Sequence, residues 1–219
     1  MTDWGPLAEK FLVDDIANSY DVIGFSEHHL PSAKLQIFHH VCKTTFRRKF
    51  IASAKPKNNG TSGGVLLAPK NHLSIAPIAN CNGLFHVGED WVAFSLRLRG
   101  IDIIVVQLYL ISGMGPKQDN LLRLGKIFTF LLSKRLLFVI FGDFNMVPEQ
   151  LYSTGFIAKS SACIIPAPTC RTGRCLDYIV TSKAFAPAIS NLQFIAKAPW
   201  KMHDTIGFDI LRAPPRGPS

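Results

Sequence analysis

The chain has 219 residues, of which 47% are hydrophobic and 18% are charged, and its formal net charge is +9. This composition allows a sizeable buried core and excludes a disordered protein. A basic chain attracts polyanions, of which nucleic acid is the commonest, although the same charge can serve solubility without any partner.

Neither the cysteines nor the apolar segments indicate secretion or a membrane. The five cysteines are an odd number without regular spacing, which is not typical of a disulfide framework. The first residues lack the basic and apolar regions of a signal peptide. The longest apolar stretch, 101–111, is too short to span a bilayer. We expect a monomeric, intracellular protein, nuclear or cytoplasmic, with no membrane partner.

The first half of the chain shows apolar spacing that alternates between helical and strand periods. A polar segment with Gly and Asn separates two of the strands and is expected to be a loop. The expected elements, in chain order, are a helix over 7–17, a strand over 21–25, a helix over 32–47, a strand over 50–54, the loop over 55–63 and a strand over 64–68.

The second half is dominated by apolar strands. Arg99 and Gly100 predict a hairpin turn between two of them. The expected elements are strands over 91–98 and 101–110, a helix over 120–133, and strands over 136–141, 176–181, 189–195 and 206–211.

About nine strands against three clear helices predict an α/β fold. Most of the strands are apolar on both faces, which indicates mixed sheets packed together with helices outside. We expect one domain over 1–212, followed by a flexible tail over 213–219 that contains three prolines.

Acidic residues follow two of the buried strands. Glu27 comes after the strand over 21–25, and Asp143 follows the strand over 136–141 and a glycine. Ligands of layered α/β proteins bind at the carboxyl ends of strands, and a carboxylate buried there needs a cation or a donor. In a basic protein, two such residues indicate a divalent metal and a phosphate, and Mg²⁺ accepts few carboxylates together with water and substrate oxygens.

The segment Gly142-Asp143-Phe144-Asn145 is the sharpest of these motifs. In extended backbone, Asp143 and Asn145 would point to the same side. One side chain could then orient a water while the other donates to a phosphate oxygen. The alternative is an ordinary Asx turn after a strand.

Two further polar residues lie beside strands near the end of the chain. Asp177 begins the strand over 176–181, where an ion pair with Arg171 or Arg174 is the alternative to a functional role. His203 precedes the strand over 206–211. A lone histidine is usually structural, whereas a buried aspartate partner would fix its tautomer and stabilise its charged form.

Six motifs in this order resemble those of the exonuclease–endonuclease–phosphatase family, which includes deoxyribonuclease I and the apurinic endonucleases. The resemblance covers 14–211, nearly the whole chain. The motifs are Ser26-Glu27-His28-His29-Leu30, Gly63-Gly64-Val65, Leu108-Tyr109, Gly142-Asp143-Phe144-Asn145, Leu176-Asp177-Tyr178-Ile179 and His203. The segments Glu27-His28-His29-Leu30 and Pro168-Thr169-Cys170 are most similar to those of apurinic-type endonuclease domains of non-LTR retrotransposons.

This resemblance implies a four-layer α/β sandwich, in which two packed mixed sheets are flanked by helices. It also implies an Mg²⁺-dependent endonuclease that nicks DNA by in-line attack of water, with Mn²⁺ as a possible substitute. Glu27 would hold the metal. Asp143 would orient or deprotonate the water, and Asn145 would fix the phosphate.

The remaining roles implied by the resemblance concern the phosphate. His203, paired with Asp177, would contact the scissile phosphate, and Tyr109 would hydrogen-bond one of its oxygens. The metal would stabilise the charge that develops on the phosphate.

The chain also departs from the family's pattern. The family begins with a strand ending in Asn, and this chain starts apparently just after it, so the sheet is expected to lack its first strand. Met202 replaces the Asp that precedes the family's histidine, and Thr205 replaces its Pro. Two alternatives therefore remain: a catalytically degenerate relative that binds nucleic acid without cutting, and a phosphatase of the same fold.

Two other patterns carry weaker hypotheses. Cys163, Cys170, Cys175 and His203 could form a zinc site, but their spacing fits no common finger, and buried free thiols are the simpler interpretation. The segment 46–57 interleaves aromatic and basic residues and could follow a nucleic-acid backbone, or could simply be a solvated helix end.

Overall fold

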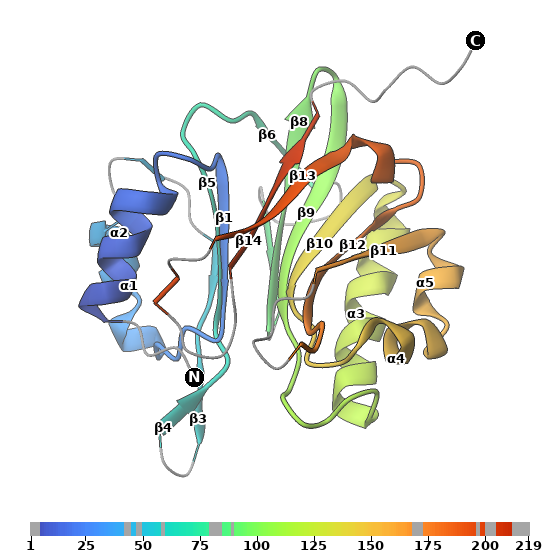
Figure 1. The fold of residues 1–219 in the computed structure, drawn as a ribbon, viewed down its shortest axis with the longest axis horizontal. Coiled ribbons are helices and arrows are strands. Elements are labelled where there is room, and N and C mark those ends of the chain that lie inside the picture. The colour runs from blue at the N-terminus through green and yellow to red at the C-terminus, as the bar shows by residue number, and fades with distance from the viewer. Residues whose placement is uncertain are drawn as a thin grey trace.

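The computed structural model describes residues 5–41, 45–46, 50–57, 60–78, 85–88, 90–167, 173–195, 198–199 and 205–211. Within these ranges the chain forms several sheets and a set of helices around them (Figure 1). The prediction of a mixed α/β fold with several sheets is confirmed. None of the helices described is long and apolar enough to cross a membrane.

The largest sheet has seven strands. Its strands β9 and β10 are parallel, and every other neighbouring pair is antiparallel. The order is β11 (Ala162–Pro166), β12 (Asp177–Ser182), β10 (Leu137–Asp143), β9 (Ile101–Tyr109), β8 (Trp91–Leu98) and β6 (Ile75–Ala76), with β7 (Phe85–Val87) also paired to β8.

The β8–β9 hairpin lies at the centre of this sheet and forms where the sequence predicts it. Arg99 and Gly100 both have positive φ, 46° and 87°, which is the conformation of a tight hairpin turn. Alternate residues of β9 face opposite sides, so that Ile104 packs toward α3 (Gln118–Lys134) and Val105 packs toward the smaller sheets. Burial on both faces explains the continuous apolar runs of these strands.

Two smaller sheets lie on the other side of β9 and β10. One has the antiparallel order β1 (Val22–Ser26), β5 (Val65–Pro69), β2 (Phe50–Ala52), and the other pairs β13 (Ile189–Ile195) with β14 (Thr205–Ile210). Helices α1 (Pro6–Phe11) and α2 (Gln36–Val41) cover the outer face of the three-stranded sheet (Figure 1). Helices α3, α4 (Pro148–Ser153) and α5 (Phe156–Lys159) cover the far face of the seven-stranded sheet.

Some local predictions are wrong. The segment 55–63 is not a loop, because β3 (Lys55–Lys57) and β4 (Gly60–Ser62) pair as a protruding hairpin. The segment lacks the apolar alternation that reveals a strand. The helix expected over 32–47 is shorter, a 3₁₀ turn at Ser32–Lys34 followed by α2. The helix over 7–17 consists of α1 and a π-helical turn at Leu12–Ile16.

Short elements account for most of what the sequence did not predict. Strands β6, β7 and β11 and helices α4 and α5 have between two and six residues each, too few for a periodicity to be recognised. The expected tail over 213–219 lies outside the described residues.

Candidate active site

Three of the predicted site residues form a row across neighbouring strands of the seven-stranded sheet. Tyr109 is the register partner of Asp143 between β9 and β10, and Asp143 is the register partner of Asp177 between β10 and β12. Directly opposed residues of paired strands have Cβ atoms about 5 Å apart. The strands therefore hold a phenol and two carboxylates side by side, and the repulsion between the carboxylates falls when a cation or a donor is brought to them.

Gly142 allows this row to form at the end of β10. Its φ is +141°, and a Cβ at this position would overlap the backbone carbonyl of Leu108 in β9. No side chain fits, because the obstacle is backbone of a neighbouring strand. The glycine of the Gly-Asp-Phe-Asn segment thus lets β10 approach β9 closely, and the pairing continues through Asp143.

Asp143 is buried, with 5% of its surface exposed, and Asn145 holds it by two hydrogen bonds. The Asn145 backbone N–H donates to Oδ1 of Asp143 at 3.0 Å, and its side-chain Nδ2 donates to Oδ2 at 2.8 Å. The expectation of extended backbone between the two residues is wrong: Asn145 has a φ of +48°, and the Asx turn considered as the alternative is present.

The second amide hydrogen of Asn145 is also engaged. Nδ2 donates to the Leu110 carbonyl at 2.8 Å, and since that carbonyl can only accept, the orientation of the amide is settled by its partner. Both hydrogens are used within the protein. In this arrangement Asn145 orients Asp143 and does not have a hydrogen left for a phosphate oxygen.

Glu27 reaches the row from the opposite sheet. It follows β1 with a φ of +61°, an uncommon conformation for a side chain of this size, and its Oε1 accepts a hydrogen bond of 2.9 Å from the Tyr109 hydroxyl. Burial, together with the charges of Glu27 and Asp143, raises the pKa of Tyr109 far above its ordinary value of 10. Tyr109 therefore stays neutral and remains a hydrogen-bond donor.

The backbone around Glu27 is fixed by the glycine pair that precedes β5. The N–H groups of His28 and His29 donate to the carbonyls of Gly64 and Gly63. The imidazole of His28 occupies the space where a Cβ of Gly64 would lie. This contact gives a physical reason for the Gly63-Gly64 motif, which would otherwise be read only as a strand start.

His28 is a structural residue. It is 2% exposed, and its Nε2 donates to the Ala52 carbonyl at 3.1 Å while its Nδ1 accepts from the Leu30 N–H at 3.0 Å. Both ring nitrogens are thus occupied. The pKa of His28 is lowered from 6.5 to about 4, mainly by burial and also by the charge of the neighbouring His29, against the opposing effect of the Ala52 carbonyl.

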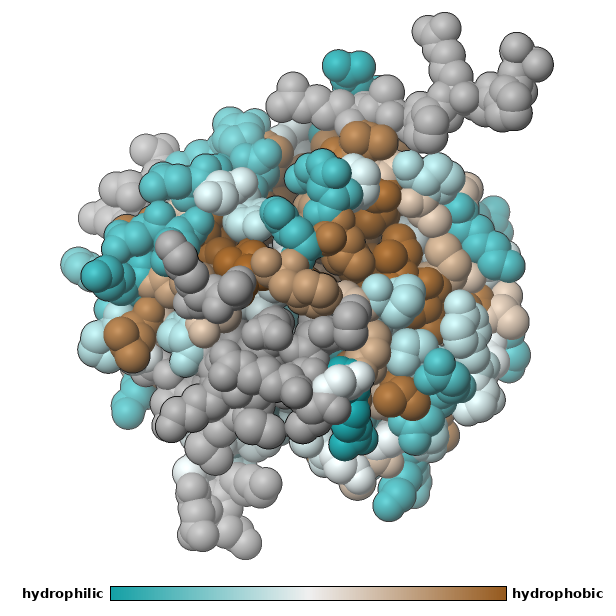
Figure 2. All heavy atoms as spheres, in the orientation of Figure 1, coloured by the Kyte–Doolittle hydropathy of each residue, from teal (hydrophilic) through white to brown (hydrophobic). Residues whose placement is uncertain are grey.

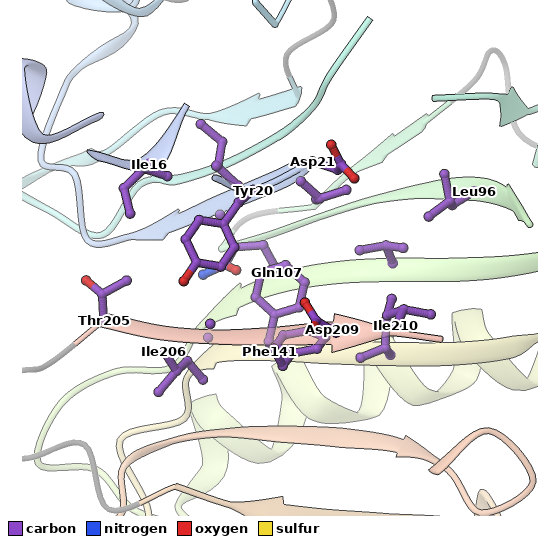
Figure 3. A pocket seen from close by; sticks show the side chains of 18 of the residues that line it. Ile16, Tyr20, Asp21, Leu96, Gln107, Phe141, Thr205, Ile206, Asp209 and Ile210 are labelled. Carbon is purple, nitrogen blue, oxygen red and sulfur yellow. The ribbon is translucent and has the colours of Figure 1, made fainter. Parts of the chain in front are cut away.

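A cavity of about 810 Å³ opens beside the row. Glu27, Asp143 and Asp177 line one end of it, and it continues between β1 and β14 along β9 and β10 (Figure 3). Apolar side chains also gather on the surface around this junction in Figure 2. The carboxylates are therefore reached from a space large enough for a ligand.

The described side chains fit a magnesium ion better than a zinc ion. In this part of the chain no three His, Cys, Asp or Glu residues are grouped as ligands. Mg²⁺ needs only one or two carboxylates, completed by water and phosphate oxygens, and Glu27 and Asp143 can provide these. Both carboxylates lie close enough to the Tyr109 hydroxyl to raise its pKa.

Several predicted residues cannot be placed. His203, Met202, Asp204 and the segment 168–170 lie outside the described residues, so the His203–Asp177 pair remains a prediction. The zinc site also remains a prediction, because two of its four residues, Cys170 and His203, lie outside the described residues. Cys175, which is described, donates its thiol hydrogen to the Ala167 carbonyl at 3.0 Å.

Gln107 is a polar residue of this region that the sequence reading did not assign to the site. It is 3% exposed, and its Nε2 donates to Oγ of Ser26, which donates in turn to the Leu108 carbonyl, each at 2.7 Å. This chain of bonds joins β9 to β1. The sequence did carry a signal for this residue, because a glutamine stands among the apolar residues of a predicted strand.

The arrangement of strands agrees with solved structures across nearly the whole chain. The endonuclease domain of TRAS1, a telomere-specific non-LTR retrotransposon, has a TM-score of 0.64 at 14% identity, with 94% of this chain and 93% of that chain covered. The AP endonuclease LMAP from Leishmania major has a TM-score of 0.66 at 14% identity, with 95% and 82% covered. The chain has the exonuclease–endonuclease–phosphatase fold.

Phosphatases share this fold as well as nucleases. The 3′ phosphatase NExo from Neisseria, in a structure bound to product DNA hairpin, has a TM-score of 0.58 at 13% identity, with 94% and 93% covered. Sequence comparison with family models and with curated proteins gives no match. The likeness to the solved structures is therefore a likeness of fold and does not identify the substrate.

Proposed function

We propose that this chain is an Mg²⁺-dependent phosphodiesterase that nicks DNA. The observation that carries the proposal is the row of Tyr109, Asp143 and Asp177, held in register across three paired strands and met by Glu27 from the opposite sheet. The phosphodiester is the substrate class that such carboxylates and a basic chain suit best.

Glu27 and Asp143 would hold the metal between them. When bound, Mg²⁺ would offset the negative charge that develops on the phosphate. Tyr109 holds Glu27 through the single hydrogen of its hydroxyl, and because the hydroxyl remains protonated, a phosphate oxygen that enters the cavity could take that hydrogen in place of Glu27.

Asp143 is the residue that would orient or deprotonate the attacking water. Its two carboxylate oxygens are fixed by Asn145, so that the carboxylate presents a constant direction to the cavity. We assign to His203, paired with Asp177, the contact with the scissile phosphate, and to Asn145 the positioning of Asp143.

The finer architecture belongs to the same proposal. We infer a four-layer α/β sandwich in a single domain over 1–212. The retroelement type of endonuclease is supported by the Glu27-His28-His29-Leu30 segment and by the likeness to the TRAS1 endonuclease domain.

The test is nicking of supercoiled plasmid by the purified chain, with Mg²⁺ or with EDTA. Asp143→Ala should reduce Mg²⁺-dependent nicking by about 10³-fold, the size of effect seen when a preorganised catalytic group is removed. The control is Asp119→Ala, which removes an exposed carboxylate on α3, a helix that contributes no residue to the lining of the cavity. Equal activity of Asp143→Ala and wild type would overturn the assignment of the site.

A phosphatase of the same fold is the second candidate, and the likeness to NExo supports it. An oligonucleotide with a 3′-phosphate separates the two activities. Release of inorganic phosphate without any plasmid nicking would favour the phosphatase. Retention of DNA by a folded chain that releases neither product would favour the degenerate relative.

A further inference from the structure

Helix α3 has a buried asparagine in its first turn. Asn120 is the third residue of the helix and has no exposed surface, whereas the other buried residues of α3 are leucine, isoleucine and phenylalanine. Asparagine is a poor helix former, and burial of its amide is unfavourable unless the polar atoms are hydrogen-bonded. The position of Asn120 therefore depends on the bonds that its side chain makes.

The side chain of Asn120 holds the segment that follows β9. The Ile111 N–H donates to its Oδ1 at 2.8 Å, and its Nδ2 donates to the carbonyls of Ile111 at 3.1 Å and of Gly115 at 2.9 Å. Because an N–H only donates and a carbonyl only accepts, these partners fix the orientation of the amide. The two bonds with Ile111 match those that a residue of a paired strand would form, and the third closes the turn over 111–115.

The turn that Asn120 closes would otherwise have considerable backbone freedom. Gly113 and Gly115 both have positive φ, 74° and 53°, and glycine has more backbone conformations open to it than any other residue. Bonds at both ends of the turn restrict these conformations. They do so from outside the cavity, because α3 covers the far face of the seven-stranded sheet and contributes no residue to the lining (Figure 1).

The segment that Asn120 holds is bonded to the candidate active site. Leu110, which directly precedes Ile111, donates its N–H to the Asp143 carbonyl at 2.9 Å, and its own carbonyl accepts from Nδ2 of Asn145 at 2.8 Å. The same Nδ2 donates to Oδ2 of Asp143. A continuous series of covalent and hydrogen bonds therefore leads from the buried side of α3 to the carboxylate that would direct the water.

We infer that Asn120 is a positioning residue of this site. By fixing Ile111 it fixes the Leu110 carbonyl, and this carbonyl holds the Asn145 amide in the orientation that aligns Asp143. The inference rests on the proposed function, because the alignment of Asp143 affects turnover only if this carboxylate directs the water. Misplacement of a reacting group by about 1 Å can lower a rate about 100-fold, so a residue that touches no substrate still affects catalysis.

The test compares Asn120→Ala with Leu124→Ala, a matched control one turn further along α3 that removes an apolar side chain with no exposed surface. Both variants should lose stability, but only Asn120→Ala should loosen the site. In amide hydrogen exchange followed by NMR, Asn120→Ala should speed the exchange of Leu110 and Asn145 about tenfold more than that of the amides in β8. Leu124→Ala should speed the exchange of all of them alike.

Plasmid nicking gives a second readout, which separates positioning from a general loss of structure. At a temperature where both variants are folded, Asn120→Ala should lower kcat about 30-fold and change KM by less than about twofold, because substrate binding does not depend on the alignment of Asp143. Leu124→Ala should change neither constant by more than about twofold.

A measurement on the wild-type chain keeps the test decisive if Asn120→Ala does not fold. The Ile111 amide, which is bonded to Asn120, should open in the same event as the Leu110 amide, so that their protection factors agree within about threefold. An Ile111 amide about 100-fold less protected than Leu110 would overturn the inference, since the bond to Asn120 would then not hold the segment.

Two results with the variants would also overturn it. One is equal loosening of Leu110 and Asn145 in Asn120→Ala and Leu124→Ala, and the other is an equal fall of kcat in both. A wild-type chain that does not nick would instead contradict the proposed function, and the role of Asn120 in turnover would fail with it. Hydrogen exchange does not require cleavage, so it would still decide whether Asn120 holds Asn145.

Discussion

The two halves of this molecule position their site residues in different ways. On one side, Tyr109, Asp143 and Asp177 stand on three consecutive strands of one seven-stranded sheet. On the other side, Glu27 is held by a backbone turn with positive φ and by the glycine pair before β5, directly after the strand that comes first in the three-stranded sheet of the described residues. The cavity lies between the halves.

This difference teaches where the site is rigid and where it can adapt. A residue inside a continuous ladder is fixed by hydrogen bonds on both sides, whereas a residue at a sheet border depends on a few local contacts. Of the two proposed metal ligands, Asp143, which would also orient the water, belongs to the first half, and Glu27 belongs to the second. Changes on the two sides should therefore have effects of different size and kind.

The largest effect should come from Gly142→Ala, which tests the rigid half. The new Cβ would overlap the Leu108 carbonyl and would sit at a φ of +141°, so steric overlap and backbone strain add. We expect the free energy of unfolding to fall by about 4 kcal/mol, measured by urea denaturation. The matched control is Gly113→Ala, which has a φ of +74° and open space around it, and should cost about 1 kcal/mol. Equal losses would show that β10 does not approach β9 as described.

A somewhat smaller effect should appear on acidification and tests the half that carries Glu27. The pKa of His28 is about 4 in the folded protein and 6.5 ordinarily, so the unfolded chain takes up its proton first. Stability should therefore be unaffected above pH 6.5 and should fall as the pH drops from 6.5 to about 4, by about 3 kcal/mol.

The comparison for that prediction is His28→Gln, whose amide can donate to the Ala52 carbonyl and accept from the Leu30 N–H in place of the imidazole. Denaturant unfolding at pH 7 and pH 4 should show a smaller loss for the variant than for wild type. The same loss in both proteins would mean that other groups cause the acid sensitivity.

The smallest effect should follow from Tyr109→Phe, which removes the hydrogen bond from the Tyr109 hydroxyl to Glu27. Glu27 is partly exposed, so water can replace the phenol, and we expect a loss of about 1 kcal/mol in the free energy of unfolding. Nicking should fall about tenfold, because Glu27 is then less well oriented. A fall in nicking as large as that of Asp143→Ala would instead place Tyr109 in the chemical step.

The rigid half was largely predictable from the sequence. The apolar runs of β8, β9 and β10 and the Arg99-Gly100 turn specify strands with few alternatives, and each polar residue at a strand end then marks the site. The backbone geometry within the Gly-Asp-Phe-Asn motif was harder to predict from the sequence. The positive φ of Asn145 makes this residue a support for Asp143 in place of the expected phosphate contact, and it is accompanied by a hydrogen bond to the Leu110 carbonyl, which directly follows β9.

The other half was harder to predict, because its contacts are long-range. Nothing in the local sequence of His28 distinguishes a metal ligand from a residue bonded to Ala52 and Leu30. The division of this half into separate sheets is a property of sheet assembly and not of any single segment. The polar β3–β4 hairpin was likewise hard to predict, because its strands pair without the alternation of apolar residues by which a strand is recognised in a sequence.

The central claim is that the two halves meet in one divalent-cation site, and binding of Mn²⁺, followed by the loss of its free-ion electron paramagnetic resonance signal, tests it most directly. Wild-type protein should bind one ion per chain, and Glu27→Gln should weaken binding at least tenfold, since it removes one of the two carboxylates available to the ion. Asp119→Asn, an exposed change on α3, serves as the control and should bind as wild type does. Equal binding by Glu27→Gln and wild type would contradict the account.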